Sequence, residues 1–108
     1  MEHNMKLQET PFNNIKNGTK TVEFRLFDEK RQLVNIGDTI TFSKLPDLKE
    51  TLTVEVLDLY KDTSFNSLFK KLYTDEEEIE RKTNAMLKYY THEEETKYGV
   101  IGIKIKLI

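Results

Sequence analysis

The change in spacing of the apolar residues constrains the fold of this chain more than any other feature. Apolar and polar residues alternate, which predicts β-strands, in the segments 20–26, 39–42, 51–61 and 100–107. Between the last two of these segments the apolar spacing becomes three to four residues. This spacing predicts two amphipathic helices, over 64–73 and 76–90.

Weaker local signals complete the predicted order of elements. Alternation over 5–7 predicts a short opening strand. Thr10 followed by proline predicts the start of a short helix over 11–17. The polar segment 28–35 predicts a turn or a short helix, and Thr91 opens a capping-box pattern that predicts a last helical turn.

About five short strands in a chain of 108 residues cannot bury both faces of an open sheet. Curling the sheet into a barrel, with helices that cover its ends, removes the exposed edges. We therefore predict one domain, residues 1–108, of the α+β class and mainly β: a small mixed β-barrel. A flat α+β sandwich is the alternative.

Composition limits the chemistry and the compartment. The chain has no cysteine, which excludes disulfides, thiolate metal sites and a cysteine nucleophile. It has no long apolar run and no secretory signal, so we expect a cytoplasmic protein without a membrane segment. The net charge is −2, but residues 75–95 carry a local charge of −5. The remaining chain is positive, so nucleic-acid binding is not excluded.

Polar side chains gather where the first predicted helix ends and the next strand begins. Alternation places Val22 and Phe24 in the core, and Glu23 and Arg25 toward solvent or a lined cavity. Beside a carboxylate, Lys20 suits a fixed positive charge that holds a phosphate or polarises a carbonyl. A guanidinium suits a phosphate or a base edge, and a carboxylate can accept from a base amino group or act as a general base. An exposed ion pair without function is the simpler interpretation.

Further candidates lie elsewhere along the chain. His3 and Lys6 are on the opening strand, Arg31 is in the polar turn, and Tyr98 is a candidate for stacking on a base. The basic residues among them are candidates for a rim that follows a phosphate backbone. The two histidines lack metal-ligand spacing, so the sequence predicts neither a metal site nor another cofactor. We interpret His92 as structural.

The pattern G-x-K-x-x-E-x-R, which begins at Gly18, resembles the signature of the ASCH domain family. Segments 3–7, 11–16, 28–31, 36–38 and 98–103 are also similar to the family's elements in order and spacing. The resemblance covers nearly the whole chain and is weakest over 44–85. It implies a small barrel similar to the PUA fold, of the size of the small bacterial single-domain members.

The resemblance also implies a link to RNA metabolism, because ASCH domains are linked to it and PUA barrels bind RNA. Some small bacterial members are amidohydrolases that act on N4-acetylcytidine with a lysine, a threonine and a glutamate. The lysine corresponds to Lys20, whereas the threonine position is Glu23 here. The family glutamate corresponds to one of residues 76–80, and the sequence does not distinguish among them.

We therefore expect a protein that binds RNA, a nucleotide or a modified nucleoside in a polar cleft. Lys20 and Glu23 are the candidate catalytic residues, and the binding candidates are Arg25, Lys6, His3, Arg31 and Tyr98. The alternative is a hydrolase, of the amidohydrolase type or a ribonuclease. A second alternative is a protein-interaction domain that uses the acidic helix.

Overall fold

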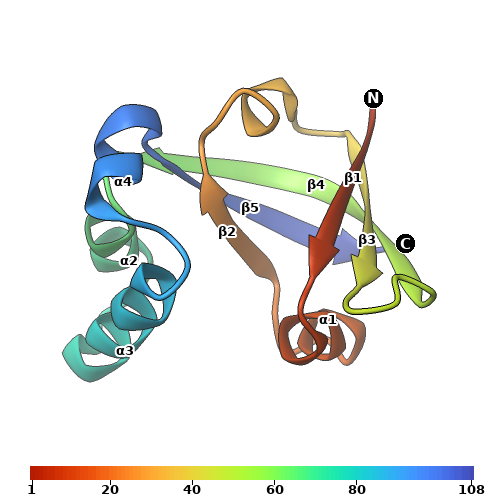
Figure 1. Cartoon of the computed structure of the whole chain (residues 1–108), viewed down its shortest axis with the longest axis horizontal. Helices are drawn as coiled ribbons and strands as arrows, with labels where there is room; N and C mark the ends of the chain where they lie inside the picture. Colours follow the sequence, from red (N-terminus) through yellow and green to blue (C-terminus); the bar gives the residue numbers. More distant parts are fainter. The chain divides into compact units, whose positions relative to one another are not determined.

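The computed structural model describes residues 1–108, with five strands and four α-helices. The elements are, in order, β1 (Glu2–Leu7), α1 (Glu9–Lys16), β2 (Val22–Leu26), a 3-10 turn (Arg31–Leu33), β3 (Thr39–Lys44), β4 (Thr51–Asp62), α2 (Phe65–Leu72), α3 (Glu76–Leu87), α4 (His92–Tyr98) and β5 (Val100–Leu107) (Figure 1). None of the helices has the length and hydrophobicity needed to cross a lipid bilayer.

The strands form a single mixed sheet in the order β1-β3-β4-β5-β2. β1 is parallel to β3, with a register that runs from the pair Glu2–Thr39 to the pair Leu7–Lys44. β3 is antiparallel to β4, and the hairpin between them contains the cis peptide bond Leu45–Pro46. The predicted α+β fold class, mainly β, is confirmed.

The chain packs into two compact units, each built from separated segments. The first unit holds residues 1–23, 34–59 and 103–108, and the second holds residues 24–33 and 60–102. The two units are described separately below. The expectation of one domain over 1–108 stays a prediction.

In the first unit, helix α1 and the strand pair β1–β3 share an apolar core. Every second residue of β1 is buried, beginning at His3, and Ile40 and Phe42 of β3 are fully buried. Phe12 and Ile15, three residues apart on α1, are the buried residues of that helix. The helix therefore contributes one narrow apolar face, as its sequence spacing requires.

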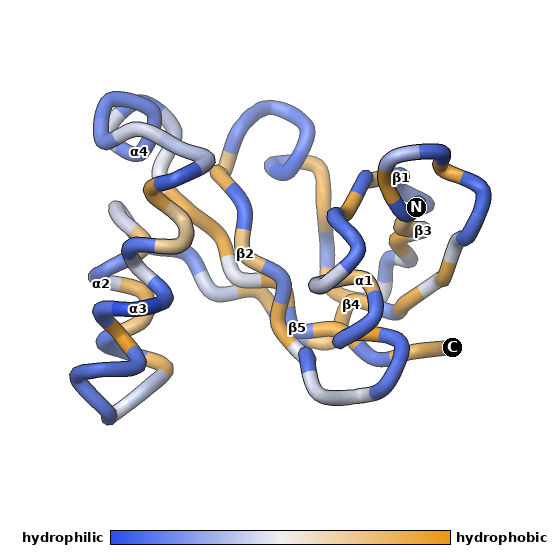
Figure 2. Tube along the Cα trace, turned by 60° about the horizontal axis from the view of Figure 1, so that its bottom comes forward, coloured by the Kyte–Doolittle hydropathy of each residue, from blue (hydrophilic) through white to orange (hydrophobic).

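In the second unit, α2 supplies most of the buried aromatic surface. The Phe65 and Phe69 rings are nearly inaccessible to solvent. Phe24 packs edge-on against Phe69 with ring centroids 4.8 Å apart, and Tyr90 stacks on Phe65 at 5.6 Å. Figure 2 shows that α3 is mostly hydrophilic, and Ile79 is its one buried residue. The contact between the Tyr90 and Phe65 rings makes Tyr90 a packing residue.

Some boundaries and faces differ from those that the sequence predicts. Helix α1 begins at Glu9, so Thr10 lies inside the helix and Gln8 occupies the N-cap position without a side-chain hydrogen bond. Helix α3 ends at Leu87, before residue 90. The first four residues of β5, 100–103, are all buried, whereas Leu107 is 40% exposed. β5 has β4 and β2 as neighbours, and an interior strand covered on both faces loses its alternation.

Candidate functional site

The segment that joins α1 to β2 holds the predicted catalytic pair. Gly18 has a φ of +86°, which ends the helix in a conformation that side chains rarely adopt. The backbone amide of Lys20 then donates to the Asn14 carbonyl, and the Ile105 amide donates to the Thr21 carbonyl. These two hydrogen bonds fix the entry into β2 and thereby the place of the side chains at its start.

Lys20 and Glu23 form an ion pair at the start of β2. Lys20 Nζ lies 3.3 Å from Glu23 Oε1. The glutamate side chain is 5% exposed, whereas the lysine side chain is 26% exposed. The expectation that Glu23 faces solvent or a lined cavity, with Val22 in the core, is therefore wrong in part: Glu23 is buried and Val22 is only half-buried. The pair consists of a sheltered carboxylate and an ammonium group that still reaches solvent.

His3 is held by an aspartate that sequence reasoning did not select. Its Nε2 lies 2.8 Å from Asp38 Oδ2, and both residues are buried. The Asn35 amide donates to the same carboxylate oxygen, and the α-amino group of Met1 lies 3.0 Å from the other. The contact with His3, followed by those with Asn35 and Met1, holds the pKa of Asp38 well below its ordinary value. The imidazole is thus already engaged within the first unit, and its role in ligand binding stays a prediction.

The other predicted binding residues are placed in different surroundings. Lys6 is exposed on β1 in the first unit. Arg25, Arg31 and Tyr98 belong to the second unit. Arg31 forms an ion pair with Asp28, with the two groups 3.1 Å apart. Tyr98 lies under a lysine ammonium group, because Lys97 Nζ is 5.0 Å from its ring centroid. The prediction that these residues share a site with Lys20 stays a prediction.

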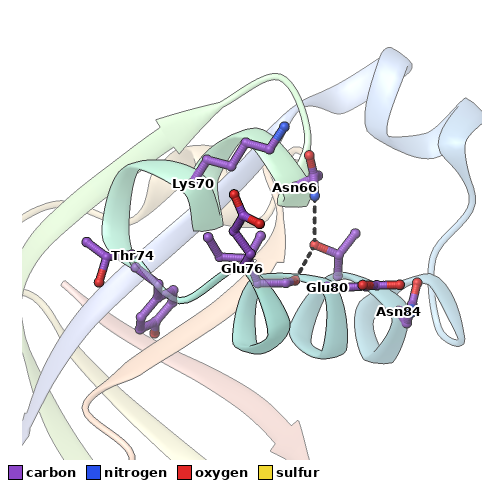
Figure 3. Close-up of a pocket in the computed structure, with 9 residues that line it drawn as sticks. Asn66, Lys70, Thr74, Glu76, Glu80 and Asn84 are labelled. Atoms are coloured by element: carbon purple, nitrogen blue, oxygen red, sulfur yellow. Dashed lines mark hydrogen bonds between the residues drawn. The ribbon is translucent and has the colours of Figure 1, made fainter.

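A pocket with a volume of about 660 Å³ lies in the second unit, between α2 and α3 (Figure 3). Its lining residues are Asn66, Lys70, Tyr73, Thr74, Glu76, Ile79, Glu80, Thr83 and Asn84. Figure 3 shows Lys70 extending from α2 and the two glutamates from α3. The Asn66 side-chain amide donates to Thr83 Oγ1, which in turn donates to the Ile79 carbonyl. The first of these bonds joins α2 to α3, and the second lies within α3.

The pocket contains none of the residues that the sequence singled out for binding or catalysis, apart from the range 76–80. Both glutamates that line it, Glu76 and Glu80, belong to that range, in which the family glutamate is expected. Burial, together with the charge of Glu78, raises the pKa of the Tyr73 phenol above its ordinary value. No group of three or more histidine, aspartate or glutamate residues in the structure is arranged to hold a metal ion.

Comparison with known proteins identifies the relatives of this chain. The family model described as the ASCH domain matches residues 5–108. The crystal structure of hypothetical protein PH0355 is 34% identical in sequence, with 100% of each chain covered and a TM-score of 0.84. The solution structure of protein PF0455 from Pyrococcus furiosus is also 34% identical. It covers 100% of this chain and 98% of its own, with a TM-score of 0.73.

A more distant structure shares the fold alone. It is the crystal structure of a variant of ZmASCH from Zymomonas mobilis, which is 16% identical, with 97% of this chain and 67% of that chain covered and a TM-score of 0.63. None of the curated proteins matches this chain. The resemblance inferred from the Gly18–Arg25 pattern is confirmed. Since the family model spans nearly all of the sequence, the chain belongs to the ASCH domain family.

Proposed function

We propose that this protein binds RNA, or a nucleoside or nucleotide from it, at the Lys20–Glu23 pair. The family supports the RNA association, because ASCH domains are PUA-like and are associated with RNA binding. The observation that carries the proposal is the unequal burial of the pair. The carboxylate is sheltered, while the lysine side chain, whose Nζ lies 3.3 Å away, is a quarter exposed.

This arrangement suits the recognition of a base and its phosphate. A sheltered carboxylate in a fixed position can accept a hydrogen bond from an exocyclic amino group of cytosine or adenine. The neighbouring lysine can turn its exposed ammonium group toward a phosphate oxygen without leaving the carboxylate. Lys6, Arg25, Arg31, His3 and Tyr98 remain the predicted additional contacts.

The test is a titration of a fluorescent single-stranded RNA at two salt concentrations. We expect Lys20→Ala to weaken binding about tenfold, which corresponds to the loss of one charge-assisted contact of about 1.4 kcal/mol. The affinity of the wild type should fall as salt rises, because phosphate contacts release counterions.

Lys104→Ala is the matched control, since Lys104 is an exposed lysine of β5 in the same unit. It removes the same charge outside the proposed site, so its effect should stay below about twofold after screening by salt. Equal losses for the two variants, or binding that does not respond to salt, would contradict the proposal.

Hydrolysis is tested in the same samples. Incubation with N4-acetylcytidine or with the RNA, followed by chromatography, detects cytidine or shortened RNA. Product that forms with the wild type but not with Lys20→Ala would replace simple binding with a hydrolase. If RNA does not bind, and charge reversal at Glu76–Glu78 abolishes binding of a protein partner, the protein-interaction alternative replaces the RNA-binding proposal.

A further inference from the structure

In the first unit, two lysines from different elements bind one carboxylate. Lys16, in the last turn of α1, places its Nζ 2.7 Å from Glu50 Oε2. Lys44, at the end of β3, places its Nζ 2.9 Å from the other oxygen, Oε1. We call these three residues the Glu50 clamp. Each carboxylate oxygen thus has its own ammonium group, supplied by a separate part of the chain.

The two lysines are held to different degrees. The Lys44 ammonium group lies 5.4 Å from the centroid of the buried Phe12 ring, and its side chain is 23% exposed. An aromatic face attracts a cation and limits its movement. The Lys16 side chain is 63% exposed and the Glu50 side chain is 40% exposed. The cation beside the ring is therefore the fixed part of the clamp, whereas the carboxylate can leave it.

The ionisation of the clamp agrees with its geometry. The two lysine contacts lower the pKa of Glu50 to about 2, and the contact with Glu50 raises the pKa of Lys44. Glu9 and Asp47 add weaker attractions on Lys44 from a greater distance. Glu50 and Lys44 are therefore both charged at neutral pH.

From this geometry we propose that the Glu50 clamp is a phosphate-binding subsite that the protein's own carboxylate occupies. A phosphodiester, like a carboxylate, presents two oxygens that share one negative charge, and lysine binds both groups as a point charge. An RNA phosphate can take the place of the Glu50 carboxylate between Lys16 and Lys44. Glu50 then acts as an internal competitor that weakens the binding of ligands with few phosphate groups.

The Glu50 carboxylate can be displaced because its ion pair with Lys16 lies at the surface. Exposed ion pairs contribute little to stability, so the fold does not depend on this one. A polyanion that displaces Glu50 also releases bound counterions, which favours the exchange at low salt. The inference rests on the proposed function, since it assigns a phosphate subsite to the same RNA-binding protein.

The test compares two isosteric variants in the RNA titration. Glu50→Gln keeps the size of the side chain but removes the competing charge, and we expect RNA to bind about five- to tenfold more tightly. The dependence of log affinity on log salt should steepen by about one, because two lysines become available for single-stranded phosphates. Glu55→Gln is the control, since Glu55 is an exposed carboxylate on β4 in the same unit. It should change the affinity less than twofold.

A second pair of measurements tests whether the gain in RNA affinity depends on the lysines of the clamp. Lys16→Ala should cost little affinity in the wild type, where Glu50 occupies the lysine, and several-fold in the Glu50→Gln background. An equal gain for Glu50→Gln and Glu55→Gln, or weaker binding of Glu50→Gln, would overturn the inference. In those cases an effect of Lys20→Ala would still support the proposed function.

If the wild type does not bind RNA at all, the proposed function fails and inorganic polyphosphate becomes the probe. Tighter binding of polyphosphate to Glu50→Gln than to Glu55→Gln would still support a phosphate subsite. Equal affinities of the two variants would overturn it.

Discussion

Two glutamates of this protein are buried to the same extent, yet their surroundings differ. Glu23, at the start of β2, and Glu95, within α4, are each 4% exposed. Glu95 accepts a hydrogen bond from the Phe65 backbone amide, 2.8 Å from its Oε2, and its Oε1 lies 2.9 Å from His92 Nδ1. Glu23 lies 3.3 Å from the Lys20 ammonium group.

The difference teaches that burial of a charge does not by itself mark a functional site. A backbone amide at the start of a helix cannot turn away from its acceptor, so Glu95 joins α4 to the start of α2 permanently. A lysine side chain has several rotamers and can turn its ammonium group toward a ligand while it keeps its carboxylate partner. The chemistry of the partner, a backbone amide in one case and a side-chain ammonium group in the other, therefore distinguishes the structural carboxylate from the candidate functional one.

The largest effect should come from the structural carboxylate. Glu95→Ala leaves the amide of Phe65 buried without an acceptor, and we expect a loss of about 3 kcal/mol in the free energy of unfolding. Urea unfolding followed by circular dichroism measures it. Glu93→Ala, in the exposed first turn of the same helix, should cost less than about 1 kcal/mol. Comparable losses in the two variants would remove the distinction.

Glu23→Gln should separate binding from stability. The amide keeps the shape of the side chain but gives up the ion pair with a partly exposed lysine, so we expect a loss of about 1 kcal/mol in stability. The affinity for RNA should fall about tenfold, because the position of Lys20 is no longer fixed. The two measurements are urea unfolding and the RNA titration. A stability loss as large as that of Glu95→Ala, with unchanged RNA affinity, would make Glu23 structural as well.

A third carboxylate, Asp62, makes the stability of the protein depend on pH. Its Oδ2 lies 2.8 Å from Lys71 Nζ and its Oδ1 accepts from the Thr63 amide. The Lys71 contact, with a smaller contribution from Thr63, lowers the pKa from 3.8 to about 2. Because the folded pKa lies below the unfolded one, this contribution to stability is complete above pH 3.8 and is lost as the pH falls toward 2.

Asp62→Asn should therefore be less stable than the wild type at neutral pH, and the difference should vanish near pH 2. Urea midpoints measured between pH 7 and pH 2 give the profile. The control is Asp75→Asn, which removes an exposed carboxylate that caps α3. A difference from the wild type that stays constant over the whole pH range would show that Asp62 contributes through packing instead.

The smallest effect concerns the start of α4, which positions Glu95. Thr91 Oγ1 accepts from the Glu94 amide, and Glu94 Oε1 accepts from the Thr91 amide. Thr91→Ala removes one half of this capping box and should cost about 1 kcal/mol by urea unfolding. Thr91→Ser keeps the hydroxyl and should recover most of the loss. If neither variant differs from the wild type, the start of α4 does not depend on its cap.

The local parts of the fold could be predicted from the sequence. The capping box at Thr91 and the apolar faces of α1 and α2 depend on residues within one or two helical turns, and the structure confirms them. The pairing of Lys20 with Glu23 was also predictable, because only three residues separate them. The burial of Glu23 was not, since strict alternation assigns it to the opposite face from Phe24 although both are buried.

Contacts between distant parts of the chain escaped sequence reasoning. His3 contacts Asp38 only because β1 pairs with β3, and the apolar pattern of a single sequence assigns faces without showing which distant strands pair. The Glu50 clamp requires that α1 and the β3–β4 hairpin meet, so neither lysine attracts attention on its own. A histidine next to an apolar position in the opening strand was the one available signal for the first contact.

The order of the strands has a consequence for the synthesis of the protein. β2, which carries Glu23, has β5 as its neighbour in the sheet, and the Thr21 carbonyl accepts from the Ile105 amide. During translation, the polar pair is made early but stays without its supporting strand until residues 100–107 have left the ribosome. A chain that lacks residues 100–107 therefore displays Lys20 and Glu23 without the strand that supports them.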